Sequence, residues 1–137
     1  MVLAAFGTNV DEATLESQAR MVPGGTEVGE LDRLARQFGL VADIRERTID
    51  ELGQLLAEGK LPIAYVDRAL FDLSPAARAQ HSLRAAKIHT VVPTRVTEAS
   101  VAYHDPLPPR ATRRSIRLFR LAYEGLGSRC VVCSKRE

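Results

Sequence analysis

His89 and Asp105 are the two residues of this chain whose types and spacing best suit catalysis. His89 opens an apolar, strand-like run, and Asp105 lies at the end of the next strand-like run. If the two runs pair as a hairpin, the two side chains come close to level at the same end of the sheet. An aspartate there can hold an imidazole in one tautomer and stabilise its protonated form. From spacing alone, however, two hydrogen-bonded surface groups are the simpler interpretation.

The other histidines and the cysteines give weaker signals. His81 lies in a polar segment, and we expect its ring to be solvated. Cys130 and Cys133 form a single CxxC motif near the end of the chain. A structural zinc needs four ligands, and thioredoxin-type motifs precede a helix, whereas this motif lies in a strand-like run. We therefore expect one buried and one partly exposed thiol on opposite faces of the strand, with no metal and no cofactor.

A basic stretch surrounds the start of the last expected helix. It consists of Arg110, Arg113, Arg114, Arg117 and Arg120. Because the overall charge of the chain is close to neutral, a solvated helix face is a better interpretation than a nucleic-acid site. An acidic partner stays open, since cations at a helix N-terminus are mildly unfavourable and a carboxylate would compensate.

The elements that must position these residues follow from apolar periodicity and capping signals. Expected helices are Val2–Phe6, a second one from Asn9 or Asp11 to about Ala19, one capped by Thr26 and ended by Gly39, one capped by Thr48 and Glu51, a weak one over Ala76–Ala86, and one starting at Ser115. Expected strands are Leu40–Arg45, Leu61–Val66, Ile88–Val96, Ser100–His104 and Arg129–Ser134, with a hairpin turn at Thr97–Ala99. We expect the prolines after Asp105 to end the sheet there.

This order predicts an α+β fold, with N-terminal helices packed on a C-terminal antiparallel sheet, in a single domain spanning residues 1–137. Residues 67–87 form an expected surface excursion from it. With 45% hydrophobic and 26% charged residues and a net charge of +2, the composition is that of an ordinary globular protein. It gives no reason to expect nucleic acid, and no apolar stretch is long enough for a membrane span. Two cysteines and the lack of a signal-like start favour a cytoplasmic location.

Several segments, in order, resemble the double-glycine-leader (bacteriocin-processing) cysteine peptidase family of the papain-like clan. Met1–Gly7 is similar to the end of that family's nucleophile helix, and the Phe38-Gly39-Leu40 ending to its second helix pair. Gly59–Ala64 resembles its glycine–x–proline strand. His89-Thr90-Val91-Val92 resembles the strand of the catalytic histidine, and Asp105-Pro106 its aspartate–proline pair. The resemblance implies a papain-like fold, with His89 as general base and Asp105 as its orienting partner.

The resemblance also implies what the chain does not contain. The family's nucleophile is a cysteine about two helical turns before the position of Met1, with an oxyanion-hole glutamine just upstream. An imidazole and a carboxylate alone cannot form an acyl-enzyme. The short first helix, with a free ammonium at its positive end, indicates that a front segment is missing. A start placed too far downstream and a truncated pseudoenzyme would both produce such a beginning.

Three hypotheses follow. The first is a papain-like peptidase domain that cleaves a leader peptide or small protein if a cysteine-bearing N-terminal extension exists. The second is a catalytically inactive relative that binds a peptide, an exporter or another partner protein in the same cleft. The third is a basic interaction domain acting through the arginine-rich helix, with salt-sensitive binding. A missing front would leave apolar surface exposed, so we also expect a homodimer.

Overall fold

The computed structural model describes residues 21–22, 25–26, 28–107 and 110–135. The helices expected before residue 20, including the segment that resembles the nucleophile helix, lie outside the described residues. The described helices are α3 (Val28–Gln37), α4 (Ile49–Ala57), α5 (Ala69–Asp72), α6 (Pro75–Gln80) and α7 (Ile116–Glu124), with a 3₁₀ turn, η1, at Leu83–Ala85. The described strands are β1 (Met21–Val22), β2 (Gly25–Thr26), β3 (Leu40–Glu46), β4 (Leu61–Asp67), β5 (Ile88–Val96), β6 (Ser100–His104), β7 (Ala111–Ser115) and β8 (Arg129–Lys135).

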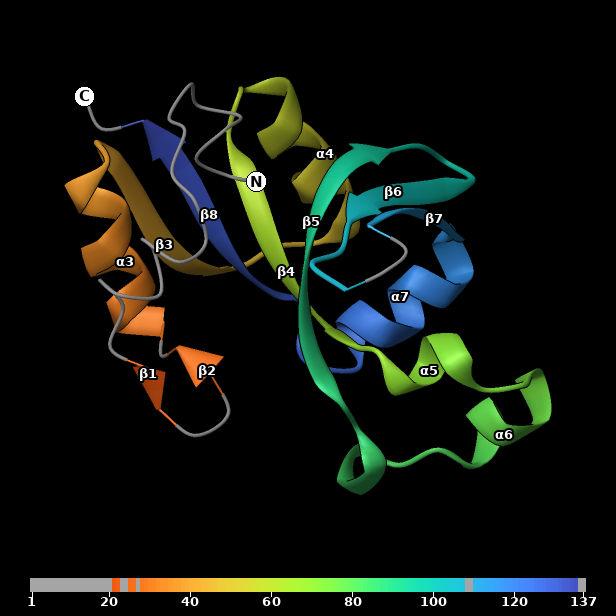
Figure 1. Ribbon diagram of the computed structural model, residues 1–137. Coiled ribbons are helices and arrows are strands. Elements are labelled where there is room, and N and C mark those ends of the chain that lie inside the picture. Colours follow the sequence, from red (N-terminus) through yellow and green to blue (C-terminus); the bar gives the residue numbers. More distant parts are fainter. Residues whose placement is uncertain (1–20, 23–24, 27, 108–109, 136–137) are drawn as a thin grey trace.

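Six of these strands form one antiparallel sheet in the order β3-β8-β4-β5-β6-β7. The last strand of the chain, β8, therefore inserts between β3 and β4. Helix α3 packs on β3 at one edge, while α5 and α7 lie together near β6 and β7 at the other side (Figure 1). The α+β arrangement expected from the sequence is confirmed.

Local signals account for the helix boundaries. Thr48 and Glu51 form the expected capping box, in which each side chain bonds the other residue's backbone N–H, and α4 starts directly after Thr48. Gly39 and Gly59 follow α3 and α4 with φ of +76° and +78°, a left-handed conformation that glycine adopts without strain. Thr26, expected to cap α3, belongs to β2 instead, and α3 begins at Val28.

The hydrophobic core lies mainly on the sheet face covered by α4, α5 and α7. Tyr103, Phe119 and Tyr123 pack in series there, with ring centroids 5.9 Å apart for each neighbouring pair. A smaller cluster around Val131 and Cys133 covers the opposite face of β8. Since β8 is covered on both sides, Cys130, Val131 and Cys133 in its middle are all buried.

The structure corrects the sequence-based expectation at two elements. The segment Ala111–Ser115 was not expected in the sheet, yet it pairs with Ser100–His104 as the edge strand β7. The helix expected over Ala76–Ala86 stops at Gln80, and the 3₁₀ turn follows it.

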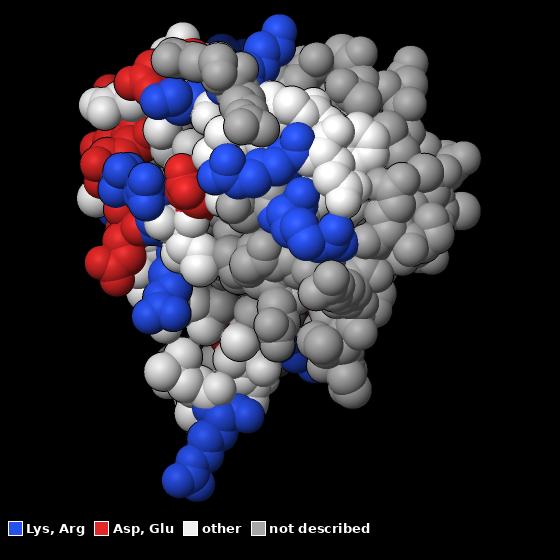
Figure 2. All heavy atoms as spheres, turned by 90° about the vertical axis from the view of Figure 1, so that its left-hand side faces the viewer, with Lys and Arg blue, Asp and Glu red and all other residues white. Residues whose placement is uncertain are grey.

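The face formed by α3, β3 and β8 carries basic and acidic side chains side by side over its described part (Figure 2). Asp43 and Arg45 pair at 3.6 Å on β3. A surface with mixed signs does not concentrate a field of one sign. Among the described residues, no helix combines the length and apolarity that a membrane crossing requires.

Candidate active site

His89 and Asp105 meet across the β5–β6 pair. Nε2 of His89 lies 2.7 Å from Oδ1 of Asp105, and their side chains are 17% and 9% exposed. The expected hairpin is present, with Thr97 accepting hydrogen bonds from the backbone N–H groups of Ala99 and Ser100 at the turn. Val92 pairs with His104, so continuing this register sets His89 diagonally across from Asp105 rather than level with it.

A β-bulge in β5 determines which face His89 points to. The register shifts by one residue between Pro93 and Arg95. Val96 packs against the core, and an odd number of positions separates it from His89. On regular alternation the two side chains would point to opposite faces of the sheet. Because the bulge absorbs one residue, His89 shares a face with Val96 and meets Asp105 there.

The carboxylate of Asp105 receives several stabilising contacts. Oδ1 accepts hydrogen bonds from His89 Nε2 and from the backbone N–H of Leu107 at 2.8 Å. Oδ2 lies 4.0 Å from Nη1 of Arg68. Burial by itself raises the pKa of Asp105, but the hydrogen bonds from His89 and Leu107 and the charge of Arg68 outweigh it and hold the pKa below its ordinary value. Asp105 is therefore an anion at neutral pH.

An anionic Asp105 fixes the tautomer of neutral His89. The carboxylate can only accept, so Nε2 must carry the proton of their hydrogen bond. This leaves the lone pair on Nδ1 of His89, and Nδ1 is the ring nitrogen that can take a proton from a nucleophile. The geometry is that of a base with its orienting carboxylate.

The structure corrects the expectation for His81. Its ring is not solvated: the side chain is 8% exposed and Nε2 lies 2.7 Å from Oδ2 of Asp67, which is 3% exposed. Asp67 ends the apolar strand β4, and a buried carboxylate at such a position requires partners. The need of a buried Asp67 for a hydrogen-bond donor is the sequence signal for this pair, although it does not indicate which residue supplies the donor.

The two cysteines are structural. Both thiols are free and buried, at 0% and 4% exposure for Cys130 and Cys133. They face opposite sides of β8 as expected, but Cys133 is not partly exposed, because the smaller cluster covers it. Burial raises the pKa of both thiols, that of Cys133 to about 11. Neither thiol has the lowered pKa of a reactive cysteine.

The arginines of the basic stretch differ in their surroundings, because Arg114 contacts core aromatic residues whereas Arg120 lies on the surface. Arg114 is engaged, since its guanidinium lies 4.9 Å from the ring centroid of Phe71 and its Nε donates to the hydroxyl of Tyr103 at 3.2 Å. Arg120 pairs with Glu124 at 2.9 Å. These contacts favour a structural role for both residues. Among the described residues, no three potential metal ligands cluster together.

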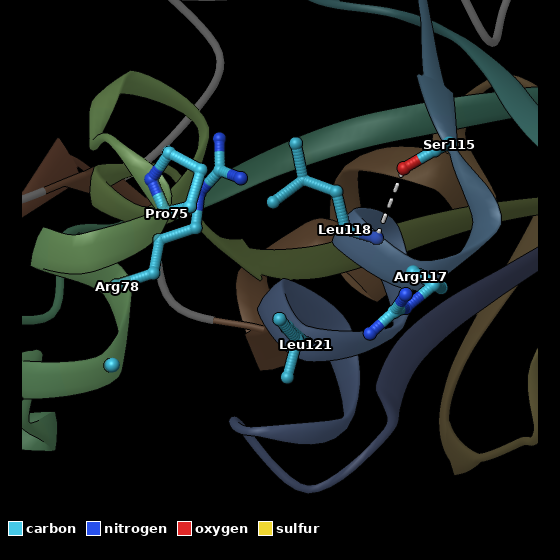
Figure 3. Close-up of a pocket in the computed structure, with 7 residues that line it drawn as sticks. Pro75, Arg78, Ser115, Arg117, Leu118 and Leu121 are labelled. Carbon is cyan, nitrogen blue, oxygen red and sulfur yellow. Dashed lines mark hydrogen bonds between the residues drawn. The ribbon is translucent and has the colours of Figure 1, made fainter.

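A separate groove lies between α6 and α7 (Figure 3). It has a volume of about 550 Å³ and does not include His89 or Asp105. Its lining is mainly apolar, with two arginines, and comprises Pro75, Arg78, Ala79, Ser115, Arg117, Leu118 and Leu121.

Comparison with solved structures places this fold among peptidase domains. A C39-like peptidase from Bacillus anthracis superposes with a TM-score of 0.71 at 18% identity, over 99% of this chain and 85% of that one. A double-glycine-motif protease domain of an AMS/PCAT transporter, solved with a leader peptide, gives 0.68 at 15% identity, over 98% and 79%. The peptidase domain of Streptococcus ComA, an ABC transporter of a quorum-sensing pathway, gives 0.65 at 14% identity, over 98% and 85%.

No protein-family model and no curated protein matches the sequence. The structural likeness confirms the papain-like fold that the sequence resemblance implied, and the chain has the fold of double-glycine and C39-like peptidase domains.

Proposed function

We propose that this chain is a peptidase-family domain in which His89 is the general base and acid and Asp105 orients it. The observation that carries the proposal is the 2.7 Å contact between His89 Nε2 and Asp105 Oδ1, within a fold shared with peptidase domains. Hydrolysis needs a cysteine from a segment preceding Met1, because Cys130 and Cys133 are buried with raised pKa values. The proposed domain is therefore the single unit 1–137 joined to such a segment, with 67–87 as an excursion.

The proposed reaction uses the proton on that cysteine. Nδ1 of His89 takes it, and the thiolate attacks the peptide carbonyl to form a thioester. His89, now an imidazolium stabilised by Asp105, gives the proton to the leaving amine. Water then attacks the thioester while Nδ1 takes a proton from the water. The released thiolate recovers that proton, so no proton is gained or lost by the domain.

A double-glycine leader peptide or a small protein is the proposed substrate. The solved AMS/PCAT protease domain holds a leader peptide, which supports this substrate class by likeness of fold. The likeness to transporter peptidase domains likewise supports an exporter as partner and the cytoplasmic side as location. Homodimerisation stays a prediction, and a monomer in light scattering at high concentration would count against it.

Matched variants of the native-length protein test the proposal. His89→Ala should lower the rate of peptide hydrolysis by a factor of about 10³ or more, because the general base is lost. His104→Ala removes a histidine from the neighbouring strand and should leave the rate within about twofold. Asp105→Asn keeps the shape but favours the wrong tautomer, and about a 10²–10⁴-fold loss is expected. Full hydrolysis by His89→Ala would overturn the proposal.

The second candidate is an inactive peptidase-like domain that binds a peptide. The groove between α6 and α7 favours peptide binding, although at a site separate from His89 and Asp105, because its mainly apolar lining also includes Arg78 and Arg117 (Figure 3). By charge complementarity the occupant would be an amphipathic peptide with acidic side chains. A fluorescent Glu/Leu peptide should bind and lose affinity on Leu121→Asp, but not on Ile44→Asp, a similarly exposed leucine-sized site on β3. Equal binding of a Lys/Leu peptide would reject this candidate.

A further inference from the structure

Asp105 uses its two oxygens unequally. Oδ1 accepts two hydrogen bonds, from His89 Nε2 and from the backbone N–H of Leu107. Oδ2 faces Arg68, whose Nη1 lies 4.0 Å away, beyond hydrogen-bond distance but within the range of an ion pair. One side of the carboxylate therefore serves the histidine, and the other side faces a cation.

Arg68 has one guanidinium nitrogen that is buried without a hydrogen-bond acceptor among the described residues. Its side chain is 27% exposed overall, but Nη1 is buried and has no hydrogen-bond partner among the described residues. Leaving a buried charged donor without an acceptor is costly. Asp105 Oδ2 is the acceptor that this nitrogen faces, and a closer approach of about 1 Å would give a charge-assisted hydrogen bond.

The second histidine–aspartate pair, His81 and Asp67, lies directly beside Arg68 in the chain. Asp67 Oδ1 accepts from the backbone N–H of Lys87 at 3.0 Å, and the N–H of Arg68 donates to the carbonyl of Lys87 at 2.9 Å. These two bonds close the base of the 67–87 excursion. Asp67 Oδ2 bonds His81 at 2.7 Å and ties the far part of the excursion to the same point. Arg68 thus follows β4 at a position where hydrogen bonds to Lys87 and His81 fix the neighbouring backbone.

We propose that Arg68 is a positioning residue for the His89–Asp105 pair, and that the His81–Asp67 pair holds Arg68 in place. Arg68 fixes the orientation of the Asp105 carboxylate through Oδ2, so that Oδ1 stays directed at His89. The segment 67–87 then has the role of holding the Arg68 guanidinium beside Asp105. The inference deepens the proposed function and rests on it, but its test does not require hydrolysis.

The test follows the side-chain carboxyl ¹³C signal of Asp105 against pH in labelled protein. Arg68→Met removes the cation at similar length and should shift the titration midpoint of Asp105 upward. Arg68→Lys keeps a cation and should restore part of the shift. Arg95→Met, at an exposed position on β5, is the matched control and should leave the midpoint unchanged. An equal midpoint in Arg68→Met and wild type would overturn the proposal.

The role of the His81–Asp67 pair is tested by a residue that does not touch Asp105. His81→Met removes the donor to Asp67 and should also raise the Asp105 midpoint, whereas His81→Gln keeps a donor and should not. An unchanged midpoint in a folded His81→Met variant would overturn this part. If that variant does not fold, hydrogen exchange of the Lys87 backbone N–H in the wild-type protein decides. An opening free energy close to that of global unfolding supports the role of the His81–Asp67 pair, and fast exchange overturns it.

These results are distinguishable from a failure of the proposed function. A native protein without a cysteine nucleophile would show no hydrolysis, yet the Asp105 midpoint would still respond to Arg68. Conversely, an active peptidase with an unresponsive midpoint would keep the proposed function and reject the role of Arg68.

Discussion

The two histidine–aspartate pairs should contribute very differently to stability. His81 and Asp67 are 8% and 3% exposed, whereas His89 and Asp105 are 17% and 9% exposed. We expect His81→Ala to lower the free energy of unfolding more than His89→Ala does, although His89 is the residue proposed to carry the chemistry.

The magnitudes follow from what each substitution leaves behind. His81→Ala leaves Oδ2 of Asp67 buried without its donor, and removing one partner of a buried pair costs about 3–5 kcal/mol. Oδ1 of Asp67 keeps the N–H groups of Ala69 and Lys87, so we expect about 3 kcal/mol. His89→Ala leaves Asp105 with the N–H of Leu107 and the charge of Arg68, at a more exposed position. The expected loss is about 1–2 kcal/mol.

Denaturant unfolding at pH 7, followed by far-UV circular dichroism, measures both losses. His104→Ala serves as a control at a half-buried histidine and should cost less than about 1 kcal/mol. A loss for His89→Ala equal to or greater than that for His81→Ala would refute the reasoning, because the more buried pair would not be the stronger support.

Three further predictions concern Asp105, the thiols and a helix cap. The lowered pKa of Asp105 stabilises the fold above its unfolded pKa of about 3.9, and this stabilisation is lost as pH falls through the folded pKa. The stability difference between wild type and Asp105→Asn should therefore shrink below about pH 4 in urea titrations, and a difference that stays constant down to about pH 2 would contradict the lowered pKa. Cys133, with a pKa of about 11 against an ordinary 9.0, should be alkylated by iodoacetamide about 100-fold more slowly in folded than in unfolded protein at pH 8, and rapid labelling of the folded chain would contradict its burial. Thr48→Ala removes the side-chain acceptor of the α4 capping box and should cost about 1 kcal/mol, whereas Thr94→Ala, at an exposed position of β5, should cost less; equal losses in thermal denaturation would show that the cap contributes little.

Much of the fold could be predicted from local signals. The bounds of β5 and β6 match the expected runs, because alternation and a Thr-based turn determine both within a few residues. Strand β7 could not be found in this way. The prolines after Asp105 predict an end to the sheet, yet the chain returns to it at Ala111, and the edge strand alternates only between exposed and half-buried residues. Sequence alternation is weak on such a strand.

The candidate site shows the same division between local and distant information. His89 and Asp105 were found because one hairpin joins them. Asp67 and His81 were missed because they lie 14 positions apart and their contact depends on how the segment between them folds back, which no short-range pattern describes. Arg68 was missed for the same reason, since its significance comes from the orientation of a side chain toward another strand.

The most direct test of the central claim is covalent labelling of the native protein with an electrophilic peptide probe directed at cysteines, followed by mass spectrometry of the adduct and of the N-terminus. The account predicts one adduct, on a cysteine upstream of Met1, that is lost in His89→Ala and retained in His104→Ala. A native N-terminus at Met1 with no adduct, or an adduct that forms equally without His89, would contradict the peptidase assignment.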